Sequence, residues 1–152
     1  MARFFEELRG EAYGVRLDAV RPDAIERALA VLRRVFGPGR YFEVQTKGLE
    51  QIPASPAMLV SNHSGGTSIP DAWGLAYVWF SHFGTERPLH VLAHDMVFAL
   101  KWPGKSFEQL GILRASRTMG EHILDQGRDL LVMPGGDVET WRPWRDRYTL
   151  RW

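Results

Sequence analysis

The residues best suited to chemistry lie in one polar loop, residues 61–71, between two apolar stretches. His63 stands near the start of this loop and Asp71 stands at its end. A histidine held by a carboxylate is a competent general base, because the carboxylate fixes the tautomer and steadies the imidazolium that forms. Gly65 and Gly66 allow tight folding and close approach of a substrate. The loop is therefore a candidate for acid–base catalysis; the alternative is a histidine bonded only to the backbone.

Other reactive side chains form weaker patterns. His90 and His94 could pair with Asp95 in a metal site, but the sequence offers no convincing third ligand, so we expect no metal. The chain has no cysteine, which excludes disulfides, thiolate nucleophiles and zinc held by cysteine. Ser64 follows His63 without the glycine-x-serine-x-glycine elbow of serine hydrolases. We therefore expect no covalent enzyme intermediate.

The elements that must position the loop alternate along the chain. Apolar runs of strand length predict strands at residues 41–46, 57–61, 89–93 and 130–133. Prolines at helix starts and apolar periodicity predict helices over residues 22–36, 70–83 and 96–110, the last with a break at Pro103-Gly104. A further helix is predicted to begin at a cap, Ser116 or Thr118, and to end at Gly127. This alternation predicts an α/β fold, with a mixed or parallel, largely buried sheet flanked by helices. His63 would then lie at the carboxyl end of a strand, where sites form in such sheets.

Three segments, in this order, resemble the motifs of the glycerolipid acyltransferase superfamily, which includes 1-acylglycerol-3-phosphate and lysophospholipid acyltransferases. Asn62-His63 followed by an aspartate resembles the first motif, whose histidine and aspartate serve as base and orienting acid. Residues 111–117 resemble the second motif, a glycine followed six positions later by a substrate-binding arginine. Residues 132–136 resemble the third, an apolar strand that ends in a proline-containing turn. The resemblance covers residues 41–145.

Two positions depart from the family pattern. The usual histidine and aspartate are separated by four residues, which would place the acid at Ser68, so the loop must bulge for Asp71 to reach His63. The third motif usually reads Pro-Glu-Gly, and here Gly135 replaces the glutamate. Pro-Gly-Gly with a glutamate shortly after it, here Glu139, is more similar to the diacylglycerol acyltransferase branch. The acceptor is therefore left open among lysophospholipids, glycerolipids and other lipid alcohols.

The resemblance implies an O-acyltransferase that moves a fatty acyl group from a thioester to a lipid hydroxyl. The co-substrate would be acyl-coenzyme A or acyl carrier protein, with no tightly bound cofactor, and transfer would be direct within a ternary complex. His63 would be the base and Asp71 its orienting acid. Residues expected to bind substrate are Asn62, Gly65, Gly66, Arg117 as a fork for phosphate or carboxylate, Gly135 and Gly136 as oxyanion donors, and Glu139. The alternative is a non-catalytic remnant that binds lipid or acyl-coenzyme A.

We expect one domain in which a helical segment, residues 1–40, precedes an acyltransferase-like part, residues 41–152. Residues 148–152 alternate like a strand. Because the resemblance implies a further strand and helix, we expect the chain to stop before this domain is complete.

Charge and apolar runs limit the partners and the compartment that we expect. The net charge is +1, which argues against nucleic acid. The longest apolar run, residues 72–80, is far shorter than the ~20 residues that span a bilayer. The N-terminus lacks the apolar core of a signal peptide. We therefore expect a cytoplasmic protein with peripheral contact at the membrane face. Helix 22–36 and the aromatic and arginine-rich residues 141–148 could each serve that contact or simply pack on the domain, and the oligomeric state stays open.

Overall fold

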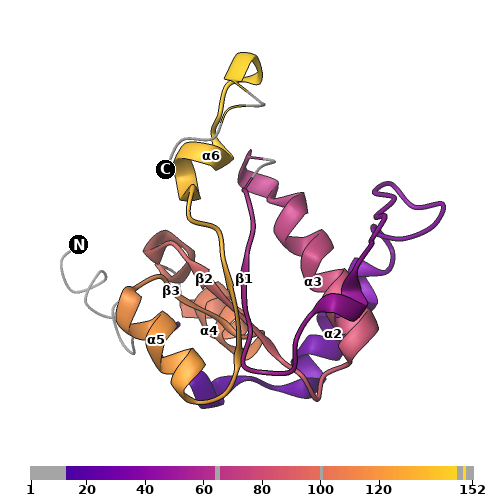
Figure 1. Ribbon diagram of the computed structural model, residues 1–152. Coiled ribbons are helices and arrows are strands. Elements are labelled where there is room, and N and C mark those ends of the chain that lie inside the picture. Colours follow the sequence, from indigo (N-terminus) through magenta and orange to yellow (C-terminus); the bar gives the residue numbers. More distant parts are fainter. Residues whose placement is uncertain (1–12, 64–65, 100, 147–148, 150–152) are drawn as a thin grey trace.

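The chain forms one parallel sheet with helices packed against it, as seen in a computed structural model that describes residues 13–63, 66–99, 101–146 and 149 (Figure 1). The four strands in the described part are β1 (Met58–Val60), β2 (Leu89–Ala93), β3 (Ile112–Arg114) and β4 (Asp129–Val132). Their order in the sheet is β1-β4-β2-β3, so the last strand of the sequence lies between the first two. The predicted α/β fold is confirmed, and every pairing is parallel.

Helices connect the strands. The described residues contain α2 (Pro22–Leu32), α3 (Pro70–Phe83), α4 (Lys101–Gln109), α5 (Arg117–Asp125) and the short α6 (Gly136–Thr140). Helices α3, α4 and α5 link β1 to β2, β2 to β3 and β3 to β4, which gives the long crossovers that parallel strands require. Single turns of 3-10 helix stand at Leu17–Ala19, Leu49–Gln51, Gly66–Ser68, Asp95–Phe98 and Trp144–Asp146.

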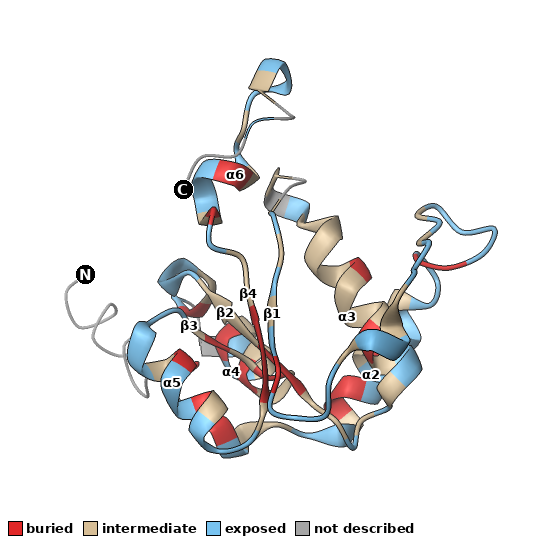
Figure 2. Ribbon diagram, in the orientation of Figure 1, coloured by how far each residue is buried: buried red, intermediate tan, exposed pale blue. Residues whose placement is uncertain are grey.

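Two apolar cores cover the two faces of the sheet. On one face Leu130 of β4 and Leu113 of β3 pack against Ile123 of α5. On the other face Leu131 of β4 and Leu89 of β2 pack against Trp79 of α3. Successive strand residues point to opposite faces, so β4 is buried on both sides (Figure 2).

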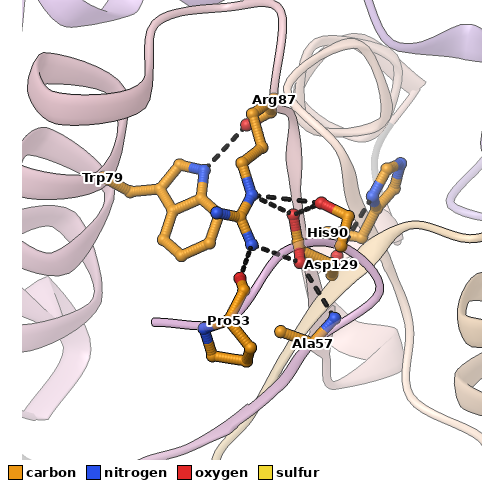
Figure 3. Close-up of polar contacts among 7 residues, drawn as sticks. Pro53, Ala57, Trp79, Arg87, His90 and Asp129 are labelled. Atoms are coloured by element: carbon orange, nitrogen blue, oxygen red, sulfur yellow. Dashed lines mark hydrogen bonds and ion pairs between the residues drawn. The ribbon is translucent and has the colours of Figure 1, made fainter. Parts of the chain in front are cut away.

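A polar cluster fastens the end of the sheet opposite the 61–71 loop (Figure 3). Asp129, the first residue of β4, accepts hydrogen bonds from Arg87 Nε at 2.7 Å, Ser55 Oγ at 2.6 Å and the Ala57 amide at 2.9 Å. The Arg87 guanidinium also lies 4.9 Å from the centre of the Trp79 ring. Burial alone would raise the pKa of Asp129, but the hydrogen bonds from Arg87 and Ser55 outweigh burial and hold that pKa below its ordinary value. The cluster ties β4 to the chain on both sides of α3.

The strand predicted at residues 41–46 is wrong. Phe42 forms a single isolated bridge with Phe36, and the two rings stack with centroids 5.1 Å apart. The β-branched and aromatic residues of this segment line a groove beside α3 instead of joining the sheet. Their composition suits any half-buried surface, which is why it suggested a strand. The strand expected over residues 148–152 falls almost wholly outside the described residues.

One helix prediction needs correction, and the structure decides between the alternatives of another. Helix α4 is continuous through Pro103, because this proline lies in the first turn, where its missing N–H is not needed. Of the two predicted caps for α5, Ser116 is the one used, since its hydroxyl accepts the Met119 N–H at 3.1 Å, and Thr118 lies inside the helix.

Candidate active site

His63 and Asp71 form a hydrogen-bonded pair at the carboxyl edge of the sheet. His63 lies just beyond β1, and Asp71 lies in the first turn of α3. His63 Nδ1 is 2.8 Å from Asp71 Oδ2, and the two side chains are 15% and 21% exposed. A carboxylate acceptor at Nδ1 favours the tautomer with the proton there, so Nε2 keeps the lone pair that a base requires. The pair is therefore arranged for proton abstraction by Nε2.

The backbone between them accounts for the long spacing. A single 3-10 turn, Gly66–Ser68, follows His63, and Gly66 has a φ of +61°. Ile69 has a φ of +37°, a region that β-branched residues rarely adopt and that costs about 1–3 kcal/mol. The turn at Ile69 directs the chain into Pro70, which opens α3. The extra loop residues are thus taken up before the helix starts, and the carboxylate of Asp71 returns to His63.

A second carboxylate holds the main chain of His63. The His63 N–H donates to Glu139 Oε2 at 2.8 Å, across 76 positions of sequence. The other carboxylate oxygen of Glu139 pairs with Arg142 at 2.5 Å, and Glu139 is only 2% exposed. Glu139 belongs to α6, which follows β4, and β4 is the direct neighbour of β1. The strand order therefore brings α6 beside the loop that carries His63.

Gly135 makes room for this carboxylate. A Cβ atom built on Gly135 would overlap the side chain of Glu139. Gly135 itself has an ordinary helical φ of −69°, so steric space rather than backbone conformation requires glycine here. Any side chain at position 135 and the observed conformation of Glu139 therefore exclude each other.

An apolar groove of about 780 Å³ runs along α3 and reaches Asp71. Its volume lies within the range of small-molecule sites, roughly 300–1,000 Å³. The side chains along it are mostly aliphatic and aromatic, and they include Phe36, Phe42, Val44, Ile52, Leu59, Leu75 and Val78. The groove can thus receive an apolar chain whose reactive end lies at the His63–Asp71 pair.

Comparisons with known proteins identify the family of this chain. A family model described as Acyltransferase matches residues 43–152, which include all three motifs. The chain belongs to the acyltransferase family. It is 31% identical over 112 residues to proteins named only as uncharacterized from Mycobacterium bovis and Mycobacterium tuberculosis, and 29% identical to one from Mycobacterium leprae. These alignments cover 73% of this chain but only 30–31% of each relative, so the chain spans about a third of their length. No solved structure matches it.

Arg117, the arginine of the second motif, lies far from His63 in this chain. It begins α5 after β3, the strand at the other edge of the sheet from β1. Three strand spacings of about 4.8 Å put roughly 14 Å of sheet between the two positions. The Arg117 side chain is 91% exposed and pairs with Glu121 at 2.8 Å. Its predicted role as an anion fork stays a prediction, and only a long substrate could touch both residues.

The remaining residues predicted to bind substrate differ in their burial and in the hydrogen bonds that they already make. The Gly136 N–H donates to the Met133 carbonyl at 3.0 Å, so this turn already uses one of the two predicted oxyanion donors. Gly135 is buried beneath Glu139. Asn62 is exposed beside His63, and Gly66 lies in the turn already described, whereas Gly65 lies outside the described residues.

The histidines considered as metal ligands have other partners. His90 is fully buried with Nδ1 3.3 Å from the Asp129 carbonyl, and His94 Nδ1 accepts the Met96 N–H at 3.1 Å. Asp95 pairs with Arg114 at 2.9 Å. Across the ranges that the structure describes, no three side chains of the metal-binding types gather into a possible site.

Sequence reasoning missed Arg142 and the contact between Glu139 and His63. Glu139 and Arg142 are three positions apart, a spacing at which side chains of a helix can meet, so their ion pair had a sequence signal. The contact with His63 had none, since it depends on which strand lies beside β1.

Proposed function

We propose that this acyltransferase moves a fatty acyl group from a thioester, acyl-coenzyme A or acyl carrier protein, to a hydroxyl of a lipid such as a lysophospholipid or glycerolipid. One observation carries the proposal: Asp71, which is hydrogen-bonded to His63, also lines an apolar groove. A base beside an apolar groove suits a reaction between a hydroxyl and an acyl chain.

The reaction needs one proton shuttle. His63 Nε2 takes the proton of the acceptor hydroxyl while that oxygen attacks the thioester carbonyl carbon, so that a C–O bond forms and the carbonyl oxygen becomes an oxyanion. Asp71 holds the proton on Nδ1 and stabilises the imidazolium. When the oxyanion collapses, the C–S bond breaks and the leaving sulfur receives the proton from Nε2. The products are an ester and a thiol, and His63 is restored.

The groove along α3 supports the acyl part of the proposal. Leu75 and Val78 stand on the helix that also carries Asp71, one and two turns further along. An extended acyl chain bound along α3 would place its carbonyl end near Asp71. The opposite wall is the 42–47 segment, whose apolar side chains face the groove rather than a strand.

Surface tryptophans support contact with a membrane. Trp102 follows β2, and Trp141 and Trp144 follow β4, and all three are strongly exposed. Strands of a parallel sheet end at one edge, so these residues share the edge that carries His63. Tryptophan is favoured where apolar and aqueous phases meet. No helix in the described ranges is long and apolar enough to cross a bilayer, so we propose a peripheral contact through this edge.

The test is acyl transfer by the purified chain, assayed by mass spectrometry of the ester. Acyl-coenzyme A and acyl carrier protein donors are crossed with lysophosphatidate, lysophosphatidylglycerol, diacylglycerol and a fatty alcohol. We expect ester formation that falls at least ~100-fold in His63→Ala, as removal of a general base predicts. His122→Ala, a change of an exposed histidine on α5, is the matched control and should retain full activity.

Transfer by His63→Ala at the wild-type rate would end the proposal. Binding of acyl-coenzyme A that is equal in the wild type and in His63→Ala, without ester formation by either, would favour the non-catalytic alternative.

A further inference from the structure

We propose that Glu139 is a positioning residue, which fixes the main chain of His63 and takes its counter-charge from Arg142, rather than a contact for substrate. The proposal rests on the proposed function, because it requires His63 to be the base.

The carboxylate of Glu139 is fully engaged within the protein. Oε2 accepts the His63 N–H, and Oε1 pairs with Arg142, whose own side chain is largely buried. A buried carboxylate is tolerated only when it is paired with a cation and hydrogen-bonded, and both conditions are met here before any substrate arrives. A substrate hydroxyl would have to displace one of these partners from a site with almost no solvent access.

Two restraints of different origin therefore act on His63. Asp71, from α3, orients the ring through Nδ1, and Glu139, from α6, fixes the backbone through the amide. Hydrogen bonds to a charged acceptor are roughly twice as strong as neutral ones, so the second restraint is a stiff one. The position of Nε2 depends on both, because the ring can only be as well placed as the Cα that carries it.

Gly135 makes this arrangement possible. The space that a side chain at position 135 would occupy is filled by the Glu139 side chain, which reaches back over the start of α6 toward β1. The observed position of the Glu139 carboxylate therefore depends on the absence of a side chain at Gly135. A Cβ at position 135 should expel Glu139 even though the residue at 139 is unchanged.

The experiment compares Glu139→Ala, Glu139→Gln and Gly135→Ala with the wild type, with Asp137→Ala as the control because Asp137 is an exposed acid on the same helix. In Glu139→Ala we expect kcat to fall about 100-fold, the effect of a misplacement of about 1 Å, while KM changes less than ~3-fold. Gly135→Ala should match it. Glu139→Gln should recover kcat to within ~10-fold of the wild type, since its amide oxygen still accepts the His63 N–H. The control should be unaffected.

A readout that does not need activity completes the test. Hydrogen exchange at the His63 amide should quicken at least ~10-fold in Glu139→Ala and Gly135→Ala and stay near the wild-type rate in Glu139→Gln and Asp137→Ala. Loss confined to KM without recovery by glutamine would assign Glu139 to substrate and overturn the proposal. So would an unchanged exchange rate at His63, or losses of kcat that merely follow the melting temperature across all variants. The proposed function fails separately, if His63→Ala keeps full activity.

Discussion

Asp71 Oδ2 lies 2.8 Å from His63 Nδ1, although the two residues are eight positions apart rather than the shorter distance usual for this family's motif. The extra length is absorbed by a 3-10 turn and by Ile69 at positive φ, so the pair closes without lengthening its hydrogen bond. The first turn of α3 also favours a charged carboxylate there, because the exposed N–H groups of a helix start carry partial positive charge.

Replacement of Asp71 by asparagine should show whether His63 needs the charge of this side chain or only its size. Asp71→Asn keeps the size of the side chain but removes the charge that favours the proton on Nδ1 and stabilises the imidazolium. We expect kcat for acyl transfer to fall at least ~100-fold. The matched control is Asp125→Asn on the exposed end of α5, which should retain wild-type turnover. Full activity in Asp71→Asn would mean that His63 needs no acid.

Strong local signals explain which elements could be predicted. Helix α3 was predicted over 70–83 because proline opens it and an apolar run fills it, and β2 was predicted over 89–93 because it is a compact apolar run. Strand β3 was missed, since three residues are too few for a pattern and only pairing with β2 makes them a strand. The strand predicted over residues 41–46 is wrong for the opposite reason, because residues typical of a strand pack along a groove there.

The contacts of the site also differ in whether the sequence could predict them. The relation of His63 to Asp71 lies within one loop, so residue type and spacing were enough to suggest it. The relation of Glu139 to His63 depends on the insertion of β4 beside β1, and neighbouring order in a sheet is a tertiary property with no local sequence signal. The resemblance implies that Arg117 binds substrate, yet the same strand order puts it at the other edge of the sheet from His63.

The groove predicts a change in acyl preference. Val78 is seven residues beyond Asp71 on α3, or roughly 10 Å of helix, so Val78→Phe should block the distal part of the groove while leaving the pair intact. We expect kcat/KM for the longest acyl donors to fall about 10-fold or more, with short donors nearly unaffected. Val31→Phe, at an exposed position of α2, is the control. An equal effect on all chain lengths would show that acyl chains bind elsewhere.

The Asp129 cluster should matter for stability rather than for chemistry. Asp129→Asn leaves the partly buried Arg87 without its counter-charge, which should lower the free energy of unfolding by roughly 3 kcal/mol. Because the folded-state pKa of Asp129 is lowered, its contribution is present above the unfolded pKa of about 4 and is lost as pH falls below it. Urea unfolding at pH 7 and pH 3.5 checks both points. Asp23→Asn, which breaks an exposed pair with Arg27, should leave the midpoint unchanged.

His90 should make the fold sensitive to mild acid. Burial, helped by the positive charge of Arg128, lowers the pKa of His90 to about 4. His90 therefore binds a proton near pH 6.5 in the unfolded chain but not in the folded chain. The free energy of unfolding thus decreases as pH falls from 6.5 toward 4. From pH 7.5 to pH 5 this amounts to roughly 2 kcal/mol. His90→Gln keeps a donor for the Asp129 carbonyl but does not titrate, so its unfolding free energy should fall less than that of the wild type over this range. Equal pH dependence would contradict the assignment.

The last prediction concerns the edge of the sheet that faces the acceptor lipid. Trp141 and Trp144 come after α6, the short helix that follows β4, and Trp144 is 79% exposed, so we place them at the edge where His63 stands. If this edge meets a membrane, Trp141→Ser and Trp144→Ser should each weaken binding to anionic phospholipid vesicles by about 10-fold, as the loss of one well-buried aromatic side chain predicts. Sedimentation with vesicles measures the binding, and Val31→Ser on α2 is the control. Acyl transfer to a detergent-dispersed lipid should survive both tryptophan changes, because His63 and Asp71, the proposed base and its acid, remain in place. Vesicle binding that is indifferent to both would assign the tryptophans to another role.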